Sequence, residues 1–147
     1  MTEAQLQEQV AQYIRLQYPD VLFHSDFGSG IKMIKGQAIK QKRQNGGIRG
    51  WPDMFIAEPL GYVGERYPDS AAGQMETAGL FLELKKEGTR IKKKNGEWAS
   101  EHIAEQALVL EKLEKRGYVA RFAVGFNEAK QIIDEYIGCN SFDENFK

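Results

Sequence analysis

The sequence predicts an α/β protein with a mixed central sheet and helices on both faces. The predicted elements follow the order helix, strand, helix, two adjacent strands, helix, strand, helix, which is typical of such sheets. The two adjacent strands, at residues 51–57 and 79–86, are joined by an irregular stretch, so we expect them to pair antiparallel. At 147 residues, with 41% hydrophobic and 28% charged residues, the chain can form one hydrophobic core.

The helices follow from apolar spacing and from residues that begin or end helices. Thr2 is a suitable N-cap for the first helix, and Ser100 for the third, which Gly117 ends. Asn127 is expected to cap the last helix. The expected helices cover residues 2–18, 31–43, 100–116 and 127–137.

The strands are short apolar runs bounded by turn residues. Residues 58–78 are interpreted as a hairpin loop or excursion, and residues 88–98 as a basic loop or ribbon that turns at Asn95-Gly96. We expect residues 1–138 to form one domain and residues 139–147 a flexible C-terminal tail. The expected strands cover residues 21–27, 51–57, 79–86 and 118–124.

The composition excludes several classes of protein. The single cysteine, Cys139, allows no internal disulfide and no zinc site built from paired cysteines. No apolar run approaches the roughly 18–20 residues that a membrane span needs, and the N-terminus lacks the order of a secretory signal. We therefore expect a cytoplasmic protein with no membrane association.

The net charge of −1 conceals two basic segments. Residues 27–52 contain six basic residues and no acid, and residues 85–94 contain six basic residues and one acid, Glu87. Clustered positive charge is expected where a protein binds a phosphate backbone, although each segment alone is also typical of a solvated loop. The candidate nucleic-acid-binding residues are Lys32, Lys35, Lys40, Lys42, Arg43, Arg49, Lys86, Arg90, Lys92, Lys93 and Lys94.

A charged pair lies within the most apolar strand, at residues 79–86. Residues i and i+2 of a strand point to the same face, so Glu83 and Lys85 share the face opposite to the leucines. Buried charges are costly unless they are paired, hydrated or bound to a metal. Asp53 begins the preceding strand, so its carboxylate would meet Glu83 at one end of the sheet if the two strands pair.

Two carboxylates at a sheet margin are suited to a hard cation such as Mg²⁺ or Mn²⁺. We expect Asp53, Glu83 and the backbone carbonyl of Leu84 as its ligands, with water and a substrate phosphate completing the coordination. Such a metal activates water and offsets charge on a phosphoryl oxygen. Lys85 would orient or help to deprotonate that water, or stabilise the charge. The structural alternative is a solvated strand end with a local ion pair.

Pro52-Asp53 followed by Glu83-Leu84-Lys85 resembles the PD-(D/E)xK nuclease motif, and the surrounding residues resemble the virus-type replication-repair nuclease (VRR-NUC) family. The resemblance covers roughly residues 2–137 and is closest to the small stand-alone versions carried by phages and prophages. The sequence departs from the family in its basic insertion around residues 90–94. The matching positions include residues 50–56 and 79–85, Gln106, the early trio Glu3, Leu6 and Gln7, and the late trio Gly125, Glu128 and Ala129.

The resemblance implies a restriction-endonuclease-like core and metal-dependent hydrolysis of DNA phosphodiester bonds. It implies that Asp53 and Glu83 bind the metal and that Lys85 is the catalytic base or stabiliser. It also implies that Gln106 supports the site from the following helix. A glutamine beside an apolar helix stripe is also typical of a rim residue with no role in chemistry.

Other residues near these segments have two interpretations. The family resemblance implies that an acid of the first helix belongs to the site, and it points to Glu3. Glu8 is the alternative, but it lies on the other side of the helix from the stripe that contains Glu3, Val10 and Ile14. As a first-turn acid, Glu3 could instead serve only the helix dipole. Trp51 and Trp98 flank the candidate site and could stack on bases, but core packing is the simpler interpretation for Trp51. His102 is expected to be exposed in a first helical turn.

We therefore expect a Mg²⁺- or Mn²⁺-dependent DNA endonuclease acting on branched or structured DNA in phage replication or repair. It would work in the cytoplasm of a bacterial or phage-infected cell. The alternative is a non-catalytic DNA- or junction-binding module on the same fold, using the two basic segments. Because a one-domain nuclease needs two copies to cut both strands together, a homodimer is a further hypothesis.

Overall fold

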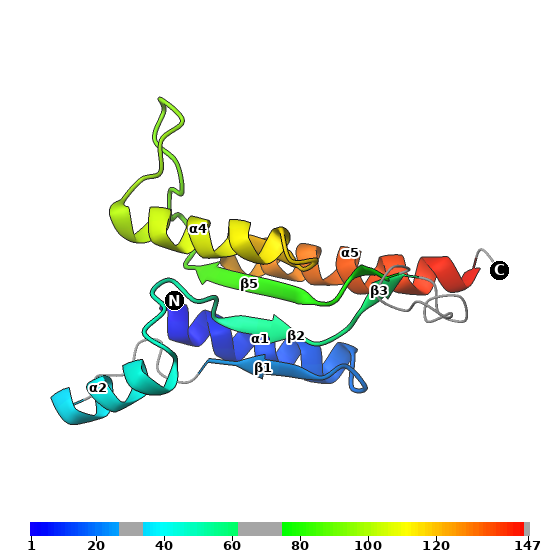
Figure 1. Ribbon diagram of the computed structural model, residues 1–147. Coiled ribbons are helices and arrows are strands. Elements are labelled where there is room, and N and C mark those ends of the chain that lie inside the picture. Colours follow the sequence, from blue (N-terminus) through cyan, green and yellow to red (C-terminus); the bar gives the residue numbers. More distant parts are fainter. Residues whose placement is uncertain (27–33, 62–74, 146–147) are drawn as a thin grey trace.

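The computed structural model describes residues 1–26, 34–61 and 75–145 (Figure 1). Lys32 lies outside them. The helices and strands follow the predicted order, and no described helix is long and apolar enough to cross a bilayer. The elements are α1 (Glu3–Gln17), β1 (Phe23–Ser25), α2 (Lys35–Gln44), β2 (Met54–Ile56), β3 (Leu60–Gly61), β4 (Met75–Thr77), β5 (Leu80–Lys85), α4 (Glu101–Glu114), β6 (Val119–Val124) and α5 (Gly125–Asn145).

Four strands form one mixed sheet in the order β1-β2-β5-β6. Strand β2 is antiparallel to both of its neighbours, β1 and β5. In the β2–β5 pair Met54 lies opposite Leu82, which confirms the predicted antiparallel pairing of these two strands. Strand β5 is parallel to β6, with Glu83 opposite Phe122. The expected excursion between β2 and β5 contains the short antiparallel pair β3-β4. All six residues of β5 are buried, so this strand is the centre of the molecule.

The two faces of β5 belong to different parts of the core. Leu80, Leu82 and Leu84 pack with apolar residues of α1 and α5, whereas Phe81 packs with residues of α4 such as Leu110. Helices therefore cover both faces of the sheet, as predicted. The face shared by Phe81, Glu83 and Lys85 is the one that α4 approaches.

Helix α1 is joined to its surroundings by polar contacts as well as by its apolar stripe. The Thr2 hydroxyl accepts a hydrogen bond from the Gln5 backbone N–H, and the Gln5 side chain accepts one from the Thr2 N–H, which confirms the predicted cap. At the other end, the hydroxyls of Tyr13 and Tyr18 donate to Asp134 Oδ1 over 2.5 and 2.6 Å. These bonds tie the first helix to the last one.

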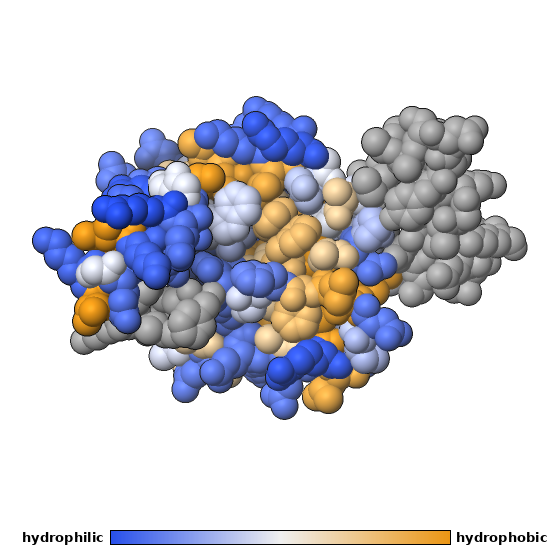
Figure 2. Space-filling view, turned by 60° about the horizontal axis from the view of Figure 1, so that its bottom comes forward, coloured by the Kyte–Doolittle hydropathy of each residue, from blue (hydrophilic) through white to orange (hydrophobic). Residues whose placement is uncertain are grey.

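Two basic elements project from the body of the molecule. Helix α2 buries none of its residues, and the segment after β5 folds back as a ribbon in which Lys92 pairs with Trp98. Gly96 has a φ of 88° at the predicted turn of this ribbon. Figure 1 shows α2 and the ribbon on the side toward which β5 points. In Figure 2 that side, on the left, is mostly hydrophilic, whereas hydrophobic residues gather near the middle of the face.

Several predicted ends were wrong. Helix α5 begins at Gly125 instead of being capped by Asn127, because Gly125 has a φ of 83° and turns the chain directly out of β6. The same helix was expected to end near residue 137, and it continues to Asn145. Strand β1 is shorter than residues 21–27, and its described part spans Phe23–Ser25.

Candidate active site

Asp53 lies where β1, β2 and β5 meet. Its backbone carbonyl accepts a hydrogen bond from the Asp26 N–H over 2.7 Å. Its side-chain Oδ2 accepts one from the Leu84 N–H, also over 2.7 Å. Pro52, directly before it, is buried. These contacts hold the Asp53 carboxylate against the end of β5, where the sequence predicts it.

Glu83 is a buried acid with two neighbours of different kinds. Its side-chain Oε1 accepts a hydrogen bond from Gln106 Nε2 over 2.7 Å, and Lys85 Nζ lies 3.8 Å from the same oxygen. Glu83 is 3% exposed, and Lys85 and Gln106 are each 5% exposed. Helix α4 therefore carries Gln106 directly to the acid and lysine of β5.

Two oxygen atoms in this group are left without a partner. Glu83 Oε2 and Gln106 Oε1 are both buried and accept no hydrogen bond from any described residue. A buried acceptor without a partner is unfavourable, and such atoms are rare in folded proteins. Both atoms lie in the group formed by Glu83, Gln106 and Lys85, so this group has oxygen atoms with unused acceptor capacity.

The charge of Asp53 disfavours the ionisation of Glu83. Burial, followed by the charge of Asp53, raises the pKa of Glu83 to about 9, although the nearby Lys85 opposes the shift. Burial likewise raises the pKa of Asp53, and the hydrogen bond from Leu84 opposes that shift. The charge of Glu3 raises both pKa values further. A positive ion between the two acids would remove this repulsion and stabilise both ionised forms.

The donor atoms at this point fit a hard divalent cation. All are oxygens, which Mg²⁺ and Mn²⁺ prefer. The Leu84 N–H points to Asp53, and because the N–H and C=O of one strand residue point to the same side, the Leu84 carbonyl does too. No three His, Cys, Asp or Glu side chains form a metal site within the described ranges. A cation here would therefore rely on Asp53, Glu83, this carbonyl and water.

The acids line a cleft of about 300 Å³ between α2, the loop before β2 and the first turns of α4. Glu3 lines this cleft, whereas Glu8 is exposed and is not among the lining residues, so the first-helix acid at the site is Glu3. The lining residues are Glu3, Asp26, Gln41, Asn45, Ile48, Gly50, Trp51, Asp53, Glu83, His102 and Gln106.

The sequence reasoning missed four polar residues that line the cleft: Gln41 and Asn45 at the end of α2, Asp26 and His102. Asp26 follows β1 and is brought to Asp53 by the pairing of β1 with β2. His102 was expected only to be exposed, and it is exposed, but it also lines the cleft. Its spacing of four residues from Gln106 places both on one face of α4, which is the signal that could have found it.

Gly50 lets the loop before β2 lie directly on α4. It has a φ of 76°, and a Cβ atom there would come within 2.9 Å of the Gln106 backbone nitrogen. No other residue type can occupy this position without moving the loop or the helix. The contact sets the wall of the cleft next to Gln106.

The candidate nucleic-acid-binding residues that the structure describes are all exposed. Lys35, Lys40, Lys42 and Arg43 lie on α2, and Arg90 and Lys92 to Lys94 on or beside the ribbon. Arg49 lies between these two groups, with its guanidinium 3.7 Å from Glu105. Basic residues thus stand on both sides of the cleft.

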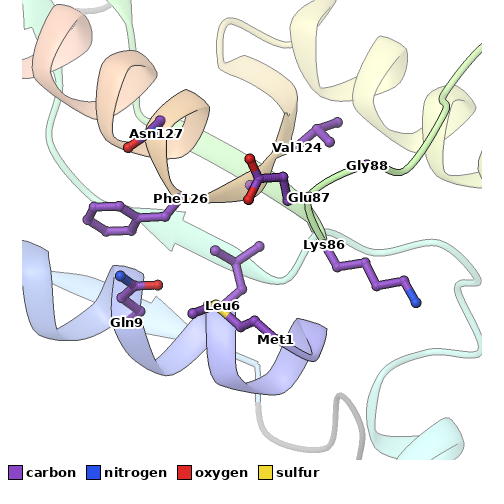
Figure 3. Close-up of a pocket in the computed structure, with 10 residues that line it drawn as sticks. Met1, Leu6, Gln9, Lys86, Glu87, Gly88, Val124, Phe126 and Asn127 are labelled. Atoms are coloured by element: carbon purple, nitrogen blue, oxygen red, sulfur yellow. The ribbon is translucent and has the colours of Figure 1, made fainter.

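Lys86 is the exception to this arrangement. It lines a separate hollow of about 560 Å³ between the first turns of α1 and α5 (Figure 3). Glu87 and Met1 line the same hollow. This hollow is larger than the cleft but contains neither Asp53 nor Glu83. The carboxylate of Glu87 lies near the start of α5 in this hollow, where it occupies the position that an anionic ligand would take. The smaller cleft, which contains both Asp53 and Glu83, is therefore the candidate active site.

The fold is that of a mixed sheet with helices on both faces and an acid pair at the end of its central strands, which is consistent with a restriction-endonuclease-like core. A solved structure described as a "VRR_NUC domain protein" has this fold, with a TM-score of 0.63 and 24% sequence identity over 95% of this chain and 91% of that one. No family model and no curated protein sequence matches the chain. The sequence resemblance is thereby confirmed at the level of the fold.

Proposed function

We propose that this chain is a divalent-metal-dependent endonuclease that hydrolyses phosphodiester bonds of branched or structured DNA. One observation carries the proposal: Asp53 and Glu83 are held together in a cleft, with a buried lysine 3.8 Å from Glu83 and a buried Glu83 oxygen that lacks a partner among the described residues. A fold shared with a VRR_NUC domain protein supports it. The resemblance to stand-alone phage proteins supports a role in phage replication or repair.

Each residue of the site has a distinct role in this proposal. Asp53, Glu83 and the Leu84 carbonyl hold Mg²⁺ or Mn²⁺, which when bound supplies Lewis-acid activation of water and neutralises developing charge. Lys85 orients the attacking water, accepts its proton or stabilises the phosphate charge. Gln106 holds Oε1 of Glu83, which leaves Oε2 directed to the ligand. Glu3 adds a further acid to the cleft.

The basic elements supply the affinity for DNA. Phosphate contacts by lysine and arginine release counterions and act without regard to base sequence. Helix α2 and the ribbon both lie on the side toward which β5 points (Figure 1), and α2 residues line the cleft that contains Asp53 and Glu83. A DNA backbone held by both elements would pass over the acid pair. This arrangement favours reading of backbone and shape over reading of bases.

The test is a cleavage panel of flap, four-way, bubble, nicked, linear and supercoiled DNA, with Mg²⁺ and with Mn²⁺. We expect wild-type protein to cut at least one structured DNA, and Asp53→Ala, Glu83→Ala and Lys85→Ala each to abolish cutting while DNA binding remains. Glu8→Ala is the matched control, since it removes an acid of α1 outside the cleft. Full cutting by all three variants would refute the assignment.

The same panel decides the alternative of a non-catalytic DNA- or junction-binding module. Binding to junctions without cutting under any divalent metal would support it. Sedimentation of the protein with and without DNA tests the proposed homodimer, because cutting both strands together requires two sites. A monomer in both conditions would exclude it.

A further inference from the structure

Trp51 is an exposed aromatic residue at the wall of the cleft. It is 46% exposed, so the expectation that it packs in the core was wrong. It lies two residues before Asp53 and lines the cleft together with Asp53 and Glu83. Large apolar side chains at a concave site are typical of ligand contacts.

The Trp51 ring is held by an aromatic neighbour on the sheet. It meets the Phe81 ring at 79° with the centroids 5.5 Å apart, and Phe81 in turn stacks on Phe55 at 4.4 Å. Behind it, Gly50 rests on the backbone of α4. An edge-to-face contact uses at most one face of an indole, and 46% of Trp51 is exposed, so part of the ring remains accessible to a ligand.

Trp98 shows that an exposed tryptophan does not always have a ring that is free to stack on a ligand. It is 37% exposed, but the ammonium group of Lys92 lies over its ring at 4.7 Å, and it lies beside Phe122 at 6.0 Å. Its ring is therefore covered by the ribbon that carries it. Trp51 combines an uncovered ring with a place beside the acid pair.

We propose that Trp51 stacks on an unpaired nucleobase next to the phosphate that is cut, and so selects DNA with single-stranded character at the cleavage point. The inference rests on the proposed function, since it takes DNA as the occupant of the cleft. Bases within a duplex are already stacked on both faces and offer only their edges. A side-chain ring reaches a base face only at a flap, gap, frayed end or single strand.

The experiment measures binding in EDTA, so that no DNA is cut. Three labelled DNAs of one sequence are compared by anisotropy: a single strand, a flap and a blunt duplex. We expect Trp51→Ala to weaken binding of the single strand and the flap roughly 5-fold to 150-fold, the range for loss of one base–aromatic stack. Binding of the blunt duplex should change less than about 2-fold, a change too small for the loss of a stack.

Two controls separate stacking from a structural role. Trp51→Phe keeps a ring and should retain most of the affinity, and Leu108→Ala, which removes an exposed apolar side chain of α4 outside the cleft, should change nothing. In a Trp98→Phe background Trp51 is the only tryptophan, so its fluorescence should be quenched by the single strand and the flap and not by the duplex.

Equal loss of affinity for all three DNAs, or equal quenching by all three, would overturn the stacking role. So would unchanged affinities in Trp51→Ala. Selective quenching in the Trp98→Phe protein, together with no cutting by the wild type in Mg²⁺ or in Mn²⁺, would refute the proposed nuclease activity and leave the stacking role supported. Failure of the two proposals is thus distinguishable.

Discussion

Gln106 on helix α4 donates a hydrogen bond over 2.7 Å to Oε1 of Glu83 on strand β5. Twenty-three residues separate the two in sequence, and both are buried. The bond occupies Oε1 of Glu83, whereas Oε2 accepts no hydrogen bond from any described residue. In the proposed function, Gln106 therefore acts through Glu83 as a positioning residue.

Removal of this hydrogen bond should weaken the site without unfolding the protein. For Gln106→Ala we expect a 10- to 100-fold lower rate or a higher Mg²⁺ requirement, roughly the usual effect of losing a partner of a metal ligand. Single-turnover cleavage across a range of Mg²⁺ concentrations measures both. Gln131→Ala is the matched control, since it removes an exposed glutamine bond on α5. A Gln106→Ala protein with the wild-type rate and Mg²⁺ dependence would contradict the assignment.

The acid pair should make the metal-free protein less stable as the pH rises. Burial and the charge of Asp53 raise the pKa of Glu83 from 4.5 to about 9. A raised pKa in the folded state means that the contribution of Glu83 to stability is complete below pH 4.5 and is lost as the pH rises toward 9. Glu83→Gln cannot ionise, so in EDTA its Tm should exceed that of the wild type increasingly between about pH 5 and pH 9.

Thermal melts in EDTA at several pH values measure this difference, which should vanish near about pH 4. Added Mg²⁺ should raise the Tm of the wild type, because a ligand that binds only the folded state stabilises it, and should not raise that of Glu83→Gln. The same Mg²⁺ shift in both proteins would place the metal elsewhere.

Gly50 should tolerate substitution less well than a nearby glycine of similar conformation. Gly46 has a φ of 71° with nothing within 4 Å of an added Cβ, whereas at Gly50 such an atom meets the backbone of Gln106. We expect Gly46→Ala to cost about 1–2 kcal/mol from conformation alone. Gly50→Ala should cost more and should also lower cleavage, because it pushes α4 away from the loop. Equal Tm values for the two variants would show that the packing against α4 is unimportant.

The basic face of α2 should contribute to binding through phosphates. Replacement of Lys40, Lys42 and Arg43 by alanine should weaken binding of all DNAs alike. On duplex DNA it should also reduce the slope of log K against log salt by about 0.9 for each phosphate that the variant no longer neutralises. The matched control replaces three basic residues at the far end of α4, Lys112, Lys115 and Arg116. A similar change in slope for both triple variants would indicate a diffuse charge effect in place of a binding face.

The parts of the fold and of the candidate site that depend on local sequence pattern could be predicted from the sequence. The period-2 pattern of β5 placed Glu83 and Lys85 on one face, and the paired strands brought Asp53 to them. Asp26 and Trp51 were not predictable in this way. Asp26 reaches the cleft through the pairing of β1 with β2, and Trp51 follows Gly50, whose backbone lies against α4. Both depend on packing between distant segments.

The bonds from Tyr13 and Tyr18 to Asp134 join residues more than 100 positions apart, and the apolar stripe of α1 packs against the same last helix. The first helix therefore lacks much of its docking surface until the last described helix has folded beside it. Glu3 reaches the cleft only when that helix has docked. The proposed cutting centre would thus be complete only when these two helices, which are distant in sequence, have docked on each other.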